Sequence, residues 1–543
     1  MIASLAANET RRDLLLLIGV CALLYLPALG ARDLWNPNEP LYGRAVVEMH
    51  EGGTWLLPTV NEQTFNEKPI LYFWLARMVS AVRGGVDEFG LRLPGALAGL
   101  AATLLLYQFV RRAVGRNRAL ISGLVFATLY AVFWSARMVQ MDLLLTLSVL
   151  STVTVLSHGS GVIRDNRRAW ILAGVSVGIG FLAKGPLAFV LPAAILFVRR
   201  PTDIKTLVRR GNALWFALTF ALVASPWFLA LWLSGETQLF SEFFVRQHFQ
   251  RFVDPWDHQR PIWYFLLNFP PDMAPWSLWL PLCLGLPLRD RREQALDRLA
   301  WLWILVPFVI FSLSASKRSI YMLPAAPAVA ILVAGLAERF VTGRLDVWRD
   351  RFCRLGVALL AAVLFAAALL VRGKIDDYPA VGSAGTATAL LLAGSAVVIL
   401  ATLFAHRRRR TLIVLTPLLA VIAIYVQVTV QVLPRVDAYK SSQPFATQVR
   451  ERVSDDDPLM SYRPWKWRAG YIYYIDRTIP RLNDAASLRD YMGRSEAVYL
   501  LVERDQLLEA LDTVPDAHVW LSAEVGSNAV HLLSNRPPPP DTE

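Results

Sequence analysis

The sequence predicts a polytopic α-helical membrane protein with about 13 transmembrane helices and a small C-terminal α/β domain. Hydrophobic residues make up 55% of its 543 residues, more than the roughly 45–50% of soluble globular proteins. Several uncharged runs approach the roughly 20 residues that a helix needs to cross a bilayer. The ten-residue alternation typical of membrane β-barrels does not occur. Helices are therefore expected, because they satisfy their backbone hydrogen bonds internally.

Thirteen apolar segments are the predicted spans. The first follows Arg11 and Arg12 and is interpreted as a retained span, because no small-residue cleavage site follows it. Cys21, Cys283 and Cys353 fall in or beside apolar runs, which favours packed thiols over disulfides or a metal site. The predicted spans lie near 13–30, 91–110, 119–136, 141–158, 169–183, 187–199, 211–233, 275–288, 299–314, 320–338, 355–372, 385–405 and 411–433.

The arginines predict the orientation of these spans. With the N-terminus in the cytoplasm, every loop predicted inside is basic, whereas outer loops 31–68 and 235–274 carry more acids than bases. The formal net charge of +12 is therefore interpreted as a topogenic signal and not as a nucleic-acid surface. The short apolar segment that starts at Pro69 is predicted to lie on the membrane, because another span would turn every later basic loop outward.

Two domains are predicted. Residues 1–433 form a transmembrane domain with interfacial helices in 31–83 and 235–274, and residues 434–543 form an α/β domain with a disordered tail. In the second domain, "AGYIYYID", "EAVYLLVE", "AHVWLSAE" and "AVHLLSN" are typical of strands, and the polar runs between them are typical of helices. An odd number of spans places this domain outside the cytoplasm.

Polar motifs in the first outer loop are candidates for chemistry. In "NPNEPLY", two prolines stiffen the backbone around Asn38 and Glu39. The motif either holds a carboxylate at the top of a cavity or forms an ordinary turn. In "FNEKPILY", Lys68 could pair with a phosphate as a point charge, and Glu67 could ligate a divalent cation. The alternative is a local salt bridge at the start of a helix.

Two further features lie on the outer side. His248 is expected on an interfacial helix and is a candidate metal ligand, although one His and one Glu are fewer ligands than a usual site has. Four cations occupy outer span ends against the positive-inside bias, which indicates either a bound phosphate head group or snorkelling toward lipid phosphates in general. Asp142 could organise the first of these cations, which are Arg137, Lys184, Lys317 and Arg318.

The order of the motifs "NE-P-LY", "EKP", "RMVQMDLLLT", "AKGP", "HFQRF" and "SKRSIYMLP" closely resembles bacterial members of the protein-O-mannosyltransferase superfamily, nearest to the aminoarabinose transferases of lipid A. The resemblance covers nearly the whole chain. It implies the GT-C architecture and an inverting glycosyltransferase that uses an undecaprenyl-phosphate sugar. The acceptor would be lipid A or another envelope glycolipid at the periplasmic face of the bacterial inner membrane. A protein acceptor and a lipid-linked sugar transporter are the alternatives.

The resemblance also implies roles for individual residues. Lys68 would bind the donor phosphate, Tyr321 would line it, and Glu67 with His248 would hold a divalent metal such as zinc. No nucleotide is expected, and we expect a monomer.

One part of the family pattern is changed in this chain. Asn38 stands where the family has an Asp, and Asn cannot take up a proton, so Glu39 is the remaining carboxylate of the motif. Unless Glu39 takes over that role, the acceptor must already be ionised. An arginine of the family pattern is replaced by Leu41. Arg44 lies one helical turn further on. Tyr42 and Arg44 are assigned to the acceptor or to structure.

Overall fold

The computed structural model describes residues 2–157, 164–199, 205, 211–236, 259–286, 291–405, 409–463 and 468–539. The chain forms two compact units. The helical unit comprises Met1–Leu29, Asn66–Ala76 and Arg92–Gln431. The sheet unit comprises Gly30–Phe65, Arg77–Leu91 and Val432–Glu543. Residues of the first outer loop thus pack with the C-terminal residues, whereas the predicted division at 433 places them in the transmembrane domain.

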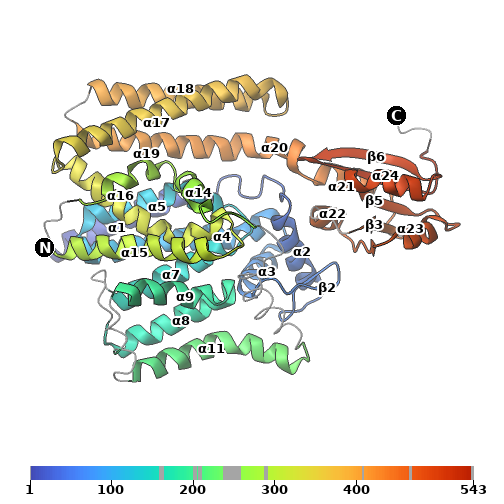
Figure 1. The fold of residues 1–543 in the computed structure, drawn as a ribbon, viewed down its shortest axis with the longest axis horizontal. Coiled ribbons are helices and arrows are strands. Elements are labelled where there is room, and N and C mark those ends of the chain that lie inside the picture. Colours follow the sequence, from blue (N-terminus) through green and yellow to red (C-terminus); the bar gives the residue numbers. More distant parts are fainter. Residues whose placement is uncertain are drawn as a thin grey trace. The chain divides into compact units, whose positions relative to one another are not determined.

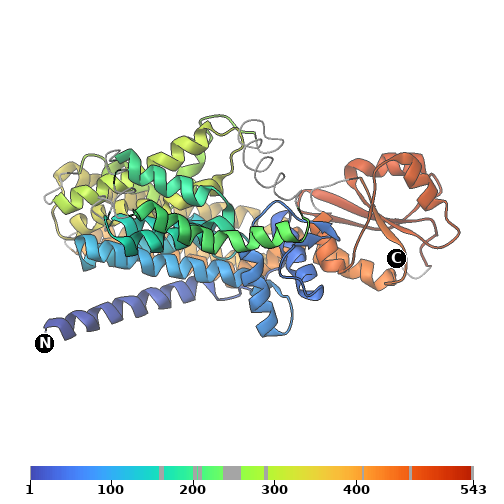
Figure 2. The ribbon, with the colours of Figure 1, turned by 90° about the horizontal axis from the view of Figure 1, so that it is seen from below.

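Helices make up nearly all of the helical unit (Figures 1 and 2). Among the described residues, seven helical stretches have the length and apolar composition of a membrane span. Thirteen spans therefore stay a prediction. The elements are α1 (Ile2–Tyr25), α3 (Leu71–Arg83), α4 (Glu88–Val114), α5 (Arg116–Thr128), α6 (Tyr130–Ser135), α7 (Asp142–Ser157), α8 (Arg167–Lys184), α9 (Leu187–Arg199), α11 (Asn212–Leu233), α14 (Tyr264–Asp272), η4 (Trp276–Cys283), α15 (Arg291–Leu313), η5 (Ser319–Ala325), α16 (Ala326–Val341), α17 (Val347–Lys374), η6 (Ile375–Asp377), α18 (Gly382–Ala405), α19 (Arg410–Gln427) and η7 (Val428–Val432).

Two predicted spans have a different form in the structure. The segment near 275–288 contains the 3₁₀-helix η4, whose 8 residues rise only about 16 Å at ~2.0 Å each, too little to cross a bilayer. The segment near 119–136 is divided into α5 and α6, because Leu129 between them is extended. By contrast, α3 has 13 residues and is too short to cross, as expected for the segment after Pro69.

Small residues let the helices of this unit approach closely. Gly174 of α8 faces α11, where an added Cβ would lie 2.5 Å from the Phe216 carbonyl oxygen. Such small residues are typical of membrane helix interfaces, where packing drives association. Three other helices, α17, α18 and α19, pack against one another (Figure 1).

The sheet unit is a three-layer α/β structure, as predicted for the C-terminal residues. Its five strands follow the order β4-β3-β5-β7-β6; β3 is parallel to β4 and β5, and β7 is antiparallel to β5 and β6. The elements are α2 (Asn38–Glu51), β1 (Thr59–Val60), β2 (Gln63–Thr64), α20 (Leu433–Lys440), α21 (Gln443–Arg452), β3 (Leu459–Tyr462), α22 (Arg468–Ile475), β4 (Arg481–Leu482), α23 (Ala485–Met492), β5 (Tyr499–Glu503), α24 (Arg504–Thr513), β6 (His518–Val525) and β7 (Asn528–Ser534).

Helices cover both faces of this sheet, because successive strand residues point to opposite sides. Leu501 of β5 belongs to the core formed with α21 and α22. Its neighbour Leu500 belongs to the core formed with α23 and α24. A strand buried on both faces reads as a continuous apolar run, which is why "VYLLV" was recognisable in the sequence.

The strand prediction for "AGYIYYID" is wrong, because this segment is helix α22. Its aromatic and β-branched residues favour a strand in isolation. In the structure, Tyr471, Ile472 and Ile475 are buried against the α21 core, a spacing that suits one face of a helix. The strand nearest before this segment in the chain is β3, which the sequence pattern did not reveal.

Candidate functional site

A salt bridge joins the ends of two antiparallel helices in the helical unit. Asp142 is the first residue of α7, and Lys184 is the last residue of α8. The Ser148 hydroxyl donates to the Ser176 carbonyl oxygen at 2.7 Å, which fixes the register in which the two ends meet. The Lys184 ammonium then pairs with the Asp142 carboxylate, and their side chains are 17% and 8% exposed. The sequence predicts that Asp142 organises Arg137, but its charge partner in the structure is Lys184.

Tyr321 lies beside this pair. The Lys184 ammonium is 5.4 Å from the centroid of the Tyr321 ring, within the range of a cation–π contact. The ring also packs 5.5 Å from Phe311, which holds it in place. Three predicted site residues from distant parts of the sequence, Asp142, Lys184 and Tyr321, therefore form one group.

The structure separates the roles of Lys317 and Arg318. Lys317 is 4% exposed, and its ammonium donates to the carbonyl oxygens of Arg260, at 3.0 Å, and Ser314. Burial lowers the pKa of Lys317. The guanidinium of the half-buried Arg318 has no hydrogen-bond or ion-pair partner in the part of the chain that the structure describes. Lys317 thus anchors the segment before η5, and Arg318 is the cation better placed to meet an anion.

The Arg137 side chain binds backbone carbonyl oxygens. It is 5% exposed, and its guanidinium donates to the carbonyl oxygens of Leu24, Tyr25 and Pro27 at 2.7–3.2 Å. The Leu24 and Tyr25 carbonyls belong to the last turn of α1 and that of Pro27 follows it, where intrahelical partners run out. This contact is a structural reason for a cation at an outer span end. The predicted phosphate role of Arg137 stays a prediction.

The metal site is only partly covered by the structure. Lys68 approaches its neighbour Glu67 at 3.8 Å between ammonium and carboxylate, with side chains 18% and 47% exposed. His248 lies outside the described residues. Within those residues no group of three or more His, Cys, Asp or Glu side chains could hold a metal. Zinc sites use three or four protein ligands, so the described residues alone do not fit this ion, and we derive no step through it.

Asp272, at the end of α14, is a candidate that sequence reasoning missed. Burial raises its pKa to about 6, and a hydrogen bond with the Ser319 side chain at the start of η5 offsets this only in part. Its Oδ2 atom has no hydrogen-bond partner among the described residues. The signal was the single acid in "NFPPDMAPW", between an apolar run and a predicted span. Asp272 therefore places a titratable group beside the segment that carries Arg318 and Tyr321.

The raised pKa of Asp272 predicts a pH-dependent stability. Its pKa is higher in the folded protein than the ordinary 3.8, so the folded state binds the proton more tightly. This stabilisation is complete below pH 4 and is lost as pH rises toward 6. We expect Asp272→Asn to gain on the order of 1–2 kcal/mol relative to the natural protein over this interval. Thermal unfolding from pH 4 to 8 measures it, and parallel curves for the two proteins would contradict it.

A second group of charges lies on α2 in the sheet unit. Glu39 is 1% exposed and pairs with the Arg32 guanidinium at 2.8 Å. The same carboxylate oxygen accepts the backbone N–H of Trp35 at 3.1 Å, and Arg32 stacks 4.2 Å over the Trp35 ring. Asp437 of α20 accepts the Trp35 indole N–H at 2.7 Å. Glu39 thus closes the 32–39 segment onto the start of α2, and Asn38 beside it is half-buried.

Arg44 and Tyr42 are also engaged within this unit. The Arg44 guanidinium bonds Glu48 at 2.8 Å and Asp476 at 2.9 Å, so it ties α2 to the end of α22. Tyr42 is 4% exposed and packs edge to face on Phe65 with centroids 6.1 Å apart. Of the two predicted roles for these residues, acceptor contact or structure, the contacts favour structure.

Comparison with known proteins places these motifs in a family. The family model of the dolichyl-phosphate-mannose-protein mannosyltransferases matches residues 67–230, a segment that includes Lys68, Asp142 and Lys184. An undecaprenyl phosphate-alpha-4-amino-4-deoxy-L-arabinose arabinosyl transferase of Pseudomonas aeruginosa is 31% identical over 380 residues, which cover 68% of each chain. The chain belongs to this arabinosyl transferase family. The resemblance of the motifs is thereby confirmed.

Other members of the arabinosyl transferase family agree. The transferase of Shewanella sediminis is 31% identical over 59% of this chain, and that of Pseudomonas fluorescens is 33% identical over 67%. The matches span 58% and 64% of the length of these two relatives.

A solved structure shares the fold. The crystal structure of ArnT from Cupriavidus metallidurans bound to undecaprenyl phosphate is 20% identical, with a TM-score of 0.75 over 96% of this chain and 98% of that one. This likeness confirms the predicted fold class, a polytopic helical membrane protein with a small C-terminal α/β part.

Proposed function

We propose that this protein is an inverting membrane glycosyltransferase that moves 4-amino-4-deoxy-L-arabinose from undecaprenyl phosphate to lipid A or another envelope glycolipid. Membership of the arabinosyl transferase family supports the donor and favours a pentose over a hexose. The basic loops support a location in the inner membrane with the site at its periplasmic face. The protein is proposed to act as a monomer.

The observation that carries this proposal is the group around Tyr321. Lys184 and the unpartnered Arg318 provide positive charge, and Asp142 holds Lys184 in position. A donor phosphate needs charge-assisted partners of this kind. Because the Lys184 and Asp142 side chains are only 17% and 8% exposed, each such interaction is stronger than it would be in bulk water.

The proposed reaction is a single displacement. An acceptor oxygen forms a bond to C1 of the sugar while the bond from C1 to the phosphate oxygen breaks. Negative charge develops on the leaving undecaprenyl phosphate, where Lys68, Lys184 and Arg318 are proposed to stabilise it. Attack from the opposite face inverts C1.

The geometry of Glu39 favours an acceptor that is already ionised. Its carboxylate is buried, and its Oε2 atom is held by two structural donors, the Arg32 guanidinium and the Trp35 N–H. Asn38 cannot serve as a base. A phosphate group of lipid A carries its own negative charge and attacks without a base.

Transfer by the purified protein tests this proposal. The protein in detergent is mixed with synthetic undecaprenyl phosphate-aminoarabinose and lipid A, and the product is examined by mass spectrometry. We expect lipid A that carries the added aminoarabinose, and no product from an undecaprenyl-phosphate hexose. Product on a protein acceptor, or sugar movement across vesicles without transfer, would overturn the proposal in favour of its alternatives.

Glu39→Gln separates a positioning residue from a base. The amide oxygen can still accept from Trp35, but Arg32 loses its charged partner. We expect the variant to lose about 1–3 kcal/mol of stability and to keep turnover within about tenfold of the natural protein, since a missing general base typically costs 10²–10⁴-fold. Thermal unfolding and initial rates on the same preparation measure both. A hundredfold loss of kcat at unchanged stability would assign the base to Glu39.

A further inference from the structure

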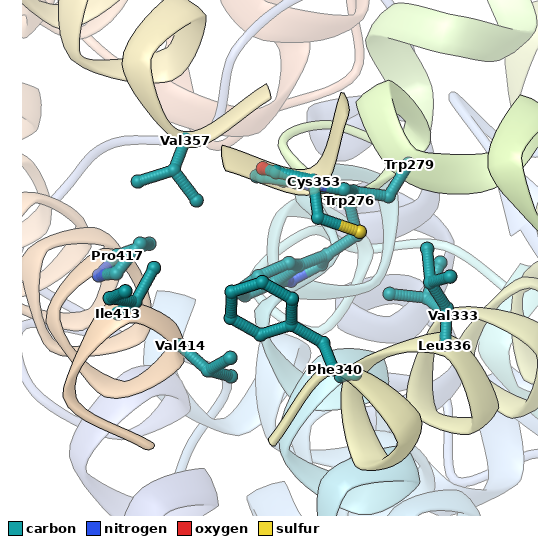
Figure 3. Close-up of a pocket in the computed structure, with 11 residues that line it drawn as sticks. Trp276, Trp279, Val333, Leu336, Phe340, Cys353, Val357, Ile413, Val414 and Pro417 are labelled. Atoms are coloured by element: carbon teal, nitrogen blue, oxygen red, sulfur yellow. The ribbon is translucent and has the colours of Figure 1, made fainter. Parts of the chain in front are cut away.

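A cavity of the helical unit is lined by apolar side chains (Figure 3). It lies between η4, α16, α17 and α19, and its space, part of which is open to the surroundings, is about 420 Å³. Trp276, Phe340 and Val357 are among its walls, and the sulfur of Cys353 lies at its edge. Cavities with such walls stay dry and accept apolar molecules. The cavity therefore suits a hydrocarbon chain and not a sugar or a phosphate.

This cavity lies at the far end of α16 from the site described above. Tyr321 precedes the N-terminus of α16 at Ala326, whereas the cavity contacts the helix from Val333 to Phe340. At ~1.5 Å per residue, Phe340 is about 21 Å along the helix axis from Ala326. The loops at this end are the basic ones, "ERFVTGRLDVWRDRFCR" and "HRRRRT". By the positive-inside rule this is the cytoplasmic end.

Positive charge borders the cavity at Phe340. The guanidiniums of Arg354 and Arg410 each lie 5.4 Å from the centroid of the Phe340 ring. Both pair with Asp350, at 2.9 Å and 2.7 Å. These three side chains together carry one unit of positive charge. These side chains are 18–29% exposed, so a ligand can reach them.

We propose that this cavity binds one acyl chain of an anionic phospholipid from the cytoplasmic leaflet, with its phosphate at Arg354 and Arg410. The apolar walls match the chain, and the excess positive charge matches the head group. The lipid also has a route to the site, because the wall residues Ala337 of α16 and Val414 of α19 are partly exposed. Basic pockets between membrane helices on the cytoplasmic side are suited to such head groups.

Lipid binding to the full-length protein tests this. Protein in detergent is titrated with phosphatidylglycerol or phosphatidylcholine of identical chains, and binding is followed by native mass spectrometry and by the rise in unfolding temperature. One net charge at the rim predicts about fivefold tighter binding of phosphatidylglycerol. Arg354→Gln and Arg410→Gln should remove that preference. Arg372→Gln, an exposed arginine at the other end of α17, is the matched control and should leave it unchanged.

Filling the cavity tests whether it holds the acyl chain of the lipid. Ala337→Phe adds a ring at its wall and should abolish binding of both lipids; Val414→Phe, at a partly exposed position, serves if the first variant does not fold. Ala193→Phe fills a different apolar cavity and should leave binding unchanged. Equal affinity for the two head groups in the natural protein would overturn the head-group assignment. Displacement of phosphatidylglycerol by undecaprenyl phosphate in equimolar competition would overturn the proposal that the occupant is a phospholipid. Neither result depends on transferase activity.

Discussion

Lys68→Ala is expected to lower kcat/KM for aminoarabinose transfer by at least about 100-fold, the loss typical of removing one well-placed donor to a developing charge. Lys68 lies in the "EKP" motif, and its ammonium lies 3.8 Å from the Glu67 carboxylate and 3.2 Å from the Glu67 carbonyl oxygen. Its side chain is 18% exposed. We expect the variant to keep its fold, and the lost activity to appear as lost stabilisation of the leaving phosphate.

Initial rates at several donor concentrations, with unfolding temperature measured in parallel, check this expectation. Lys68→Arg should recover part of kcat, because it restores the charge without the ammonium geometry. Lys374→Ala is the matched control: Lys374 belongs to the same unit, is 74% exposed and pairs with Asp377. Activity of Lys68→Ala near that of this control would remove Lys68 from the site.

Arg118→Met is expected to destabilise the helical unit by about 3–5 kcal/mol. Arg118 of α5 is 1% exposed; it pairs with Asp297 of α15 and donates to the Ile331 carbonyl oxygen of α16 at 3.1 Å. A methionine would leave the Asp297 charge buried without its partner. The guanidinium also fills the space above Gly335, where an added Cβ would lie 2.7 Å from it, so three helices meet at this side chain.

The double variant Arg118→Met, Asp297→Leu provides the control. Replacing a whole buried ion pair by apolar groups is often neutral, whereas removing one partner is costly. We expect the double variant to recover most of the stability that the single variant loses, as measured by thermal unfolding in the same detergent. Equal losses in the two variants would show that packing, and not the uncompensated charge, determines the effect.

The predicted site residues differ in their surroundings in ways that their motifs do not show. Lys184 and Tyr321 were predicted from their motifs and lie in one group, but their proximity depends on α8 and η5 meeting, which no local pattern reveals. Lys317 and Arg318 were indistinguishable as neighbours in "SKRSIYMLP". The structure distinguishes them, because the Lys317 ammonium is held inward by the carbonyl oxygens of Arg260 and Ser314. Asp272 was missed because its burial arises from contacts distant in sequence.

The fold was likewise predictable from the sequence only in part. Apolar runs of helix length identified the membrane helices, since the cost of unsatisfied backbone groups in lipid leaves few alternatives. In the C-terminal residues, "EAVYLLVE" was recognised as a strand because a doubly buried strand is a continuous apolar run. The segment "AGYIYYID" has a similar composition and forms α22, because its partners in the α21 core, and not its own preference, decide which face is buried.

By itself, the sequence determined that this is a helical membrane protein, which end of each span carries the basic loops, and which motifs place it among the arabinosyl transferases. These properties depend on composition and local order, and each residue contributes to them without reference to a distant partner. The tertiary structure alone decided that Asp142 pairs with Lys184, that Glu39 is bound by Arg32, and that an apolar cavity lies beside Phe340. These depend on side chains brought together from separate helices, and the energy of a pair or a cavity exists only once those helices are packed.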